Sequence, residues 1–259
     1  MTDNTLPLII AHRGASALAP ENTLAAFRRA IESGADGIEF DVRLAKDRVA
    51  VVHHDSTLRR TAGLEKRIRE LTSDELSKID VGSWFRQAEP EKWSDLYTRE
   101  TVPTLAATLD SLGDFAGRVF IELKFSPGQK PEPLVRAVCD AIRNSSLSDT
   151  IIVKSFRLAS IPHLHTLCPG VRTAALFAPK IMTILRKEKH LVDLAAEFGA
   201  DELSVHYSLV TKKLMKKASK LGLPVTMWTV DHPRWLRRGI KLGVNAVITN
   251  DPSKLLELR

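Results

Sequence analysis

The chain has 259 residues, of which 44% are apolar and 27% are charged. This composition predicts a large buried core and a single domain spanning residues 1–259, since α/β barrels of about 250 residues commonly form one domain. The formal charge of +7 suits an anionic ligand, but aromatic residues make up only 6% of the chain and no basic run is interleaved with them. We therefore expect no nucleic-acid partner.

The amino-terminal sequence MTDNTLPLIIAHRG has no basic segment before its short apolar run. It fits neither a secretory signal nor a membrane span, and we expect a cytoplasmic protein. Cys139 and Cys168 lie in segments with helical patterns and have no metal-binding spacing. We interpret both as buried free thiols, because a disulfide is rare in that compartment.

Apolar runs and helical patterns alternate from the start of the chain. Residues 8–12 form an apolar run typical of a buried parallel strand, and a helix that Asn22 or Thr23 can cap extends from Pro20 to Gly34. A second strand covers residues 37–43. A turn at Asp47 and a further apolar run at 49–53 indicate an extended strand pair.

Residues 56–102 break this rhythm, and we expect them to form an insertion over the barrel mouth. The alternation of strands and helices then returns. The predicted strands are at 119–123, 150–153, 171–176, 202–205, 225–228 and 246–249. The predicted helices are at 132–143 and begin at Leu158, at Thr211, at Pro233 and after Asp251. Strands separated by helices predict βαβ units, and eight of them favour a TIM (β/α)8 barrel with a small insertion after strand two. An open doubly wound sheet is the alternative, but residues 12–16 lack the G-x-G-x-x-G spacing of its phosphate loop.

Three acids fall on strands of this predicted barrel. Glu39 and Asp41 point to the same face of one strand, and Glu122 and Lys124 do so on another, because side chains alternate along a strand. Carboxylates that converge inside a barrel repel one another unless a cation neutralises them. Oxygen ligands favour Mg²⁺ or Ca²⁺ over zinc. Any one of these acids alone would equally serve as a salt-bridge partner.

Two histidines follow strand ends. His12 and His54 are candidates for general acid and base, because imidazole exchanges protons near neutral pH. His53 faces the opposite side by alternation, and we expect a structural role for it. Arg13 and Lys124 are candidate phosphate contacts, since guanidinium and ammonium groups both bind phosphate oxygens.

In its motifs the sequence resembles the glycerophosphodiester phosphodiesterases over nearly its whole length. The motifs follow the order of that family: His12-Arg13-Gly14, Glu21-Asn22-Thr23, Glu39-Phe40-Asp41, His54-Asp55, Gly82-Ser83-Trp84, Pro103-Thr104-Leu105, Ile121-Glu122-Leu123-Lys124, Ser155-Phe156, Trp228-Thr229-Val230 and Thr249-Asn250-Asp251. The resemblance implies a TIM-type barrel with an insertion after strand two. It also implies metal-dependent hydrolysis of small glycerophosphodiesters to glycerol 3-phosphate and an alcohol.

The resemblance also implies roles for individual residues. One divalent metal ion, Mg²⁺ or Ca²⁺, would be held by Glu39, Asp41 and Glu122. His12 and His54 would be the general acid/base pair. Arg13 and Lys124 would contact the phosphate of the substrate, and Trp228 would form an aromatic wall of the site. Ser155, Phe156 and His206 are further candidate substrate contacts. The three carboxylates, a dication, Arg13 and Lys124 leave one net positive charge, which matches a phosphodiester monoanion.

Two residues depart from the family pattern. Lys154 stands where the family usually has a small or apolar residue, and Asp231 stands where asparagine is common. If Lys154 points inward, it adds a cation to the site and alters the expected substrate preference.

Two other functions are compatible with the motifs. A lysophospholipase D-type hydrolase would act on lysophospholipids, and the basic residues after Thr211 and Pro233 would then make a weak contact with an anionic membrane surface. We favour instead a solvated helix face for the same residues. A catalytically silent binding module would have lost a histidine or a metal-binding acid, and neither is lost here. We infer no oligomeric state from the sequence.

Overall fold

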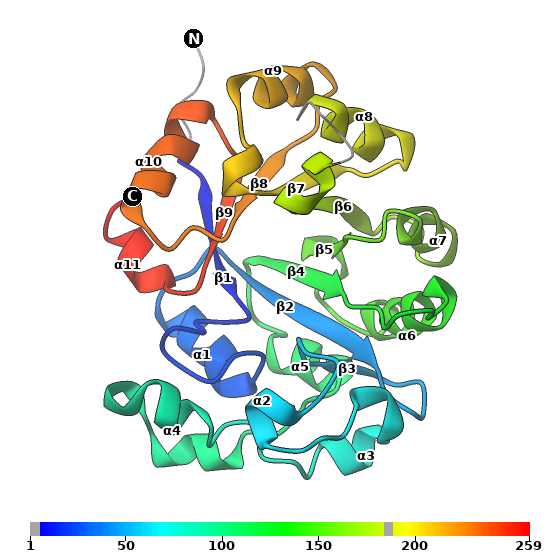
Figure 1. The fold of residues 1–259 in the computed structure, drawn as a ribbon, viewed down its shortest axis with the longest axis vertical. Helices are drawn as coiled ribbons and strands as arrows, with labels where there is room; N and C mark the ends of the chain where they lie inside the picture. Colours follow the sequence, from blue (N-terminus) through cyan, green and yellow to red (C-terminus); the bar gives the residue numbers. More distant parts are fainter. Residues whose placement is uncertain (1–5, 184–188) are drawn as a thin grey trace.

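The computed structural model describes residues 6–183 and 189–259, and in them eight parallel strands close into a barrel (Figure 1). The strands are β1 (Leu8–His12), β2 (Gly37–Leu44), β4 (Arg118–Leu123), β5 (Ile151–Ser155), β6 (Arg172–Phe177), β7 (Glu202–His206), β8 (Val225–Trp228) and β9 (Ala246–Thr249). Pairing of β1 with both β2 and β9 closes the ring. Strand β3 (Ala50–Val52) pairs antiparallel with β2 outside the ring. The TIM-barrel prediction and the strand pair after strand two are confirmed.

Helices follow the strands around the barrel. They are α1 (Leu24–Glu32), α5 (Leu105–Ser111), α6 (Pro131–Arg143), α7 (Ser160–Leu167), α8 (Lys189–Glu197), α9 (Lys212–Lys220), α10 (Pro233–Leu242) and α11 (Pro252–Leu256). The sequence pattern did not predict α5 or α8. Thr23 rather than Asn22 caps α1, because the Thr23 hydroxyl accepts a hydrogen bond from the Ala26 amide. Within the described residues, no helix combines the length and apolar character needed to cross a bilayer.

Alternation along the strands separates an apolar outer layer from the barrel interior. On β4, Val119, Ile121 and Leu123 pack outward in one cluster with the neighbouring helices, whereas Phe120 packs in a second, smaller cluster. That smaller cluster also contains Ile10, Ile152, Ala174, Ala246 and Ile248 and fills the interior. Glu39, Glu122 and Lys154 belong to the same inward-facing rows. The interior therefore has an apolar floor, with charged groups above it at the carboxyl ends of the strands.

The insertion consists of short helices: α2 (Arg59–Ala62), η1 (Ile68–Glu70), α3 (Ser73–Leu76), α4 (Phe85–Ala88), η2 (Pro90–Lys92) and η3 (Asp95–Arg99). Several of its apolar residues form a separate core with Ala45 and Val51 beside β3. In Figure 1 it lies to one side of the barrel, beyond α1 and α5. The expectation that it covers the barrel mouth was wrong for most of its length. Its residue Arg60 reaches the polar groups near the strand ends, where it donates to Asp55 and Glu21.

Candidate active site

A cluster of three carboxylates lies at the carboxyl ends of β2 and β4. Glu39, Asp41 and Glu122 are 0%, 1% and 5% exposed, and each offers an oxygen within 4.8 Å of the other two. Their oxygens Glu39 Oε1, Asp41 Oδ1 and Glu122 Oε1 are buried, and each lies within 3.2 Å of a lysine ammonium group. Because three adjacent buried carboxylates need positive charge and offer only oxygen ligands, as Mg²⁺ and Ca²⁺ prefer, the residues present fit a hard divalent cation.

Three basic side chains lie against these acids. Lys154 Nζ is 2.7 Å from Glu39 Oε1. Lys124 Nζ is 2.5 Å from Glu122 Oε1 and 3.2 Å from Asp41 Oδ1. Arg13 Nε is 3.2 Å from Asp41 Oδ2. The cations thus balance the acids one for one.

The surroundings set the pKa of each acid differently. Burial acts to raise the pKa of Asp41, but Lys124 and Arg13 outweigh it and the pKa falls. Burial likewise opposes the lowering of the Glu39 pKa, which Lys154 and His12 produce. Burial, followed by the charge of Asp41, raises the pKa of Glu122 above its ordinary value. Of the three acids, Glu122 therefore has the charged form that a nearby dication would stabilise most, because burial and the neighbouring Asp41 disfavour that form.

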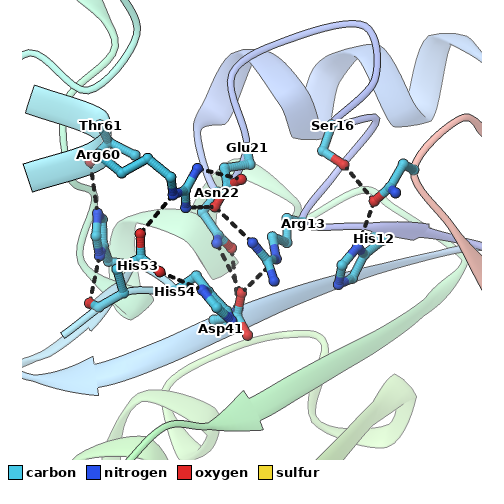
Figure 2. Close-up of polar contacts among 12 residues, drawn as sticks. His12, Arg13, Ser16, Glu21, Asn22, Asp41, His53, His54, Arg60 and Thr61 are labelled. Carbon is cyan, nitrogen blue, oxygen red and sulfur yellow. Dashed lines mark hydrogen bonds and ion pairs between the residues drawn. The ribbon is translucent and has the colours of Figure 1, made fainter. Parts of the chain in front are cut away.

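A left-handed turn after β1 places Arg13 over the acids. Arg13 and Gly14 have φ values of 55° and 77°, and the Arg13 amide donates to Glu39 Oε2 at 3.2 Å. A side chain at Gly14 would meet the backbone of Ala26 at 2.6 Å, so α1 packs directly against this turn. The Arg13 guanidinium also donates to Glu21 at 2.9 Å, which holds it beside Asp41 (Figure 2).

Hydrogen bonds orient the ring of His12. The Asn250 amide nitrogen lies 2.6 Å from Asp231 Oδ2, which only accepts, so Asn250 Oδ1 faces His12. His12 Nδ1 lies 2.6 Å from that oxygen and must donate to it. In the neutral ring, Nε2 is then an unprotonated acceptor, and it lies 3.9 Å from Glu39 Oε2. Burial is the main cause that lowers the pKa of His12, so the ring is neutral near pH 7.

A carboxylate orients the second histidine. His54 Nδ1 donates to Asp55 Oδ1 at 2.8 Å, and Asp55 Oδ2 accepts from Arg60 at 2.7 Å. Arg60 also donates to Glu21 at 2.6 Å. Figure 2 shows the His54 ring beside Asp41, so its Nε2 edge is available to the site. Hydrogen bonding from His54 and Arg60 lowers the pKa of Asp55, which is therefore ionised.

His53 has the structural place expected for it. Its side chain is buried, Nδ1 donates to the Asp55 carbonyl at 2.9 Å, and Nε2 accepts from the Thr61 hydroxyl at 3.1 Å. Both ring nitrogens are therefore engaged away from the carboxylate cluster. Cys139 and Cys168 are buried free thiols.

A cavity of about 220 Å³ joins these groups, and it is lined by His12, Arg13, His54, Glu122, Lys124, Lys154, Phe156, Trp228 and Thr229. Phe156 and Trp228 form its aromatic wall, and their ring centroids are 5.8 Å apart. His206 is not part of the lining. Its ring packs against that of Trp228, with 5.4 Å between the centroids. Ser155 is fully buried and its hydroxyl accepts from the Arg157 amide, so it supports the turn after β5.

The sequence alone predicted no role in the site for several residues that hold it together. Asn22 accepts from the Asp41 amide at 3.1 Å and donates to Asp41 Oδ2 at 3.0 Å. Asn250 and Asp231 orient His12, and Asp55 orients His54. Asn22, Asp55 and Asn250 lie within motifs recognised in the sequence, so their presence was visible but their partners were not.

The comparison with family models gives one match, to the glycerophosphoryl diester phosphodiesterase family, over residues 12–254. The chain belongs to this family. A glycerophosphodiester phosphodiesterase from Caldanaerobacter subterraneus is 34% identical over 255 residues, with 97% of each chain covered. One from Bacillus subtilis is 31% identical, with 95% of this chain and 84% of that protein covered.

Solved structures from the same family share the barrel. An Oleispira antarctica phosphodiesterase, determined in complex with the product sn-glycerol-3-phosphate, has a TM-score of 0.84 and 26% identity, over 97% of this chain and 96% of that one. A glycerophosphodiester phosphodiesterase from Thermotoga maritima has a TM-score of 0.73 and 26% identity, over 98% and 99% of the chains. The family resemblance inferred from the motifs is thereby confirmed.

Proposed function

We propose that this protein is a divalent-metal-dependent hydrolase that cleaves glycerophosphodiesters to glycerol 3-phosphate and an alcohol. The observation that carries the proposal is a cluster of three buried carboxylates beside one small cavity, which Glu122, two oriented histidines and three cations line. Membership of the family supports the substrate class. The relative solved with glycerol 3-phosphate supports a small phosphate ligand.

Glu39, Asp41 and Glu122 would hold the metal ion. When bound, a hard dication supplies positive charge that stabilises the charge developing on the phosphoryl oxygens. Arg13 and Lys124 reach the cavity from the turn after β1 and from the end of β4, and they provide further cationic contacts to the same oxygens. Ion pairs with the acids hold both side chains next to the cavity.

The histidines divide the proton transfers. His12 is neutral with a free Nε2, so it takes the proton from the attacking hydroxyl, whether that hydroxyl belongs to water or to the substrate glycerol. His54, held by Asp55, gives a proton from Nε2 of its doubly protonated ring to the leaving alcohol oxygen and becomes the neutral ring with its proton on Nδ1. The wall of Phe156 and Trp228 packs against the apolar parts of the glycerol or alcohol.

Hydrolysis of glycerophosphocholine tests the proposal directly. Release of glycerol 3-phosphate should stop in excess chelator and return with Mg²⁺ or Ca²⁺. The Asp41→Asn variant should stay inactive at every metal concentration that restores the wild type. Full activity in chelator would remove the metal from the reaction.

A lysophospholipase D-type activity is the second candidate, and the exposed rim of the cavity favours it. Phe156 is 46% exposed and borders the lining, so an acyl chain has an apolar surface to lie on as it leaves the cavity. Lysophosphatidylcholine assayed beside glycerophosphocholine distinguishes the two. A higher kcat/KM for the lysolipid would make it the preferred substrate.

A further inference from the structure

Lys154 is a buried cation inside the barrel that the proposed mechanism does not use. It lies on β5 in register with Glu122, and the residue is 2% exposed. Its Nζ is 2.7 Å from Glu39 Oε1. Lysine is almost never fully buried unless its charge is paired. The site must therefore compensate this ammonium group, and Glu39 is the acid that does so.

The contact concerns the oxygen of Glu39 that is available to a metal ion. Glu39 Oε2 accepts the Arg13 amide at 3.2 Å and faces His12, whereas Oε1 is the oxygen that contacts the Lys154 ammonium. A dication bound by the carboxylate cluster needs this oxygen as well. Lys154 and the dication therefore compete for one ligand atom.

The charge balance shows what this competition does. Without an ion, Lys154, Lys124 and Arg13 balance the three acids. A bound dication then leaves two net positive charges in the cavity, one more than a site with a neutral residue at position 154. A cavity with two positive charges matches a phosphomonoester dianion better than a phosphodiester monoanion.

We propose that Lys154 is a built-in counter-ion that exchanges with the divalent metal at Glu39 and, once displaced, binds the dianionic phosphomonoester product. It has three effects: it stabilises the metal-free cluster, it weakens metal binding, and it strengthens retention of glycerol 3-phosphate. The displaced ammonium stays in the cavity, because Lys154 already lines it beside Lys124 and Phe156. This inference rests on the metal site proposed above.

The test compares the wild type with Lys154→Met, which keeps an unbranched apolar side chain and removes the charge. Titration calorimetry of Mg²⁺ and Ca²⁺ into chelator-treated protein should give tighter binding in Lys154→Met, by about 10-fold or more. Thermal unfolding in chelator should occur at a lower temperature. Inhibition of the metal-saturated enzyme by glycerol 3-phosphate should weaken, by about 10-fold or more.

Lys220→Met is the matched control, because Lys220 is exposed on α9 and its loss changes the net charge equally. It should leave metal affinity and product inhibition at wild-type values. If Lys154→Met does not fold without metal, Lys154→Gln keeps a hydrogen-bond donor toward Glu39 and should shift both measurements in the same directions.

The outcomes separate this inference from the proposed function. Metal binding by the wild type with equal or weaker affinity in the neutral variants would overturn the exchange at Glu39. Unchanged product inhibition would overturn the role in product binding. Absence of metal binding in both the wild type and Lys154→Met would overturn the metal site itself, and the exchange with it.

Discussion

Replacing Asn250 with alanine should slow catalysis through His12 alone. Asn250 accepts a 2.6 Å hydrogen bond from His12 Nδ1, which sets the ring tautomer and leaves Nε2 free to accept a proton. A net hydrogen bond is worth about 1–2 kcal/mol, and each 1.36 kcal/mol is tenfold in rate. We therefore expect kcat/KM for glycerophosphocholine to fall about 5- to 30-fold. Metal affinity should not change, because Asn250 does not contact the carboxylate cluster.

A double-mutant cycle tests whether the effect passes through His12. Initial rates of glycerol 3-phosphate release are measured for His12→Ala, Asn250→Ala and the double variant at saturating metal. Since removal of His12 removes the group that Asn250 orients, the double variant should be no slower than His12→Ala. The reasoning fails if Asn250→Ala has wild-type kcat/KM, or if the two losses multiply in the double variant.

Three further predictions concern the histidines and their acids. The acidic limb of kcat/KM should have a midpoint below the ordinary histidine value of 6.5, because burial lowers the pKa of His12 and the neutral ring is the active form; a midpoint above 6.5 would contradict this assignment. His54→Ala should lower kcat by ~10²-fold or more at pH 7, as expected for loss of a general acid, and a loss of only a few-fold would exclude that role. Asp55→Asn should lower the free energy of unfolding, measured by urea denaturation, at neutral pH. Because the pKa of Asp55 is lowered in the folded state, its contribution is full above about pH 4 and is lost as the pH falls below that value, so the two unfolding curves should converge in acid. A difference that grows toward acid pH would contradict the ion pairs with His54 and Arg60.

The sequence predicted the part of the site that depends on strand alternation. Glu39, Asp41 and Glu122 lie on strands whose apolar residues alternate with them, so a barrel brings them together whatever the details of the loops. The positions of His12 and His54 were predicted in the same way, because His12 is the last residue of β1 and His54 lies two residues beyond β3. The inward direction of Lys154 did not follow from the pattern. The predicted strand at 150–153 stops one residue short of Lys154, whereas β5 continues to Ser155, so the alternation of faces was not extended to this side chain.

The remaining contacts depend on tertiary structure. Asn22 lies at a helix start and has the chemistry of a cap, but its left-handed backbone turns its amide toward Asp41 instead. Asn250 and His12 are 238 residues apart in the chain, and only closure of the barrel makes β9 the neighbour of β1. The insertion packs on a core of its own beside β3, and its short helices give little periodicity from which that position could be predicted.

Arg60 links the insertion to both sides of the proposed active site. Its guanidinium joins Asp55, which orients His54, to Glu21, which holds Arg13. Grafting the 56–102 segment from another member of the family onto this barrel should therefore change the orientation of His54, the proposed proton donor, and of Arg13, the proposed phosphate contact, together. A chimaera keeps both only if the donated segment brings an arginine to this position.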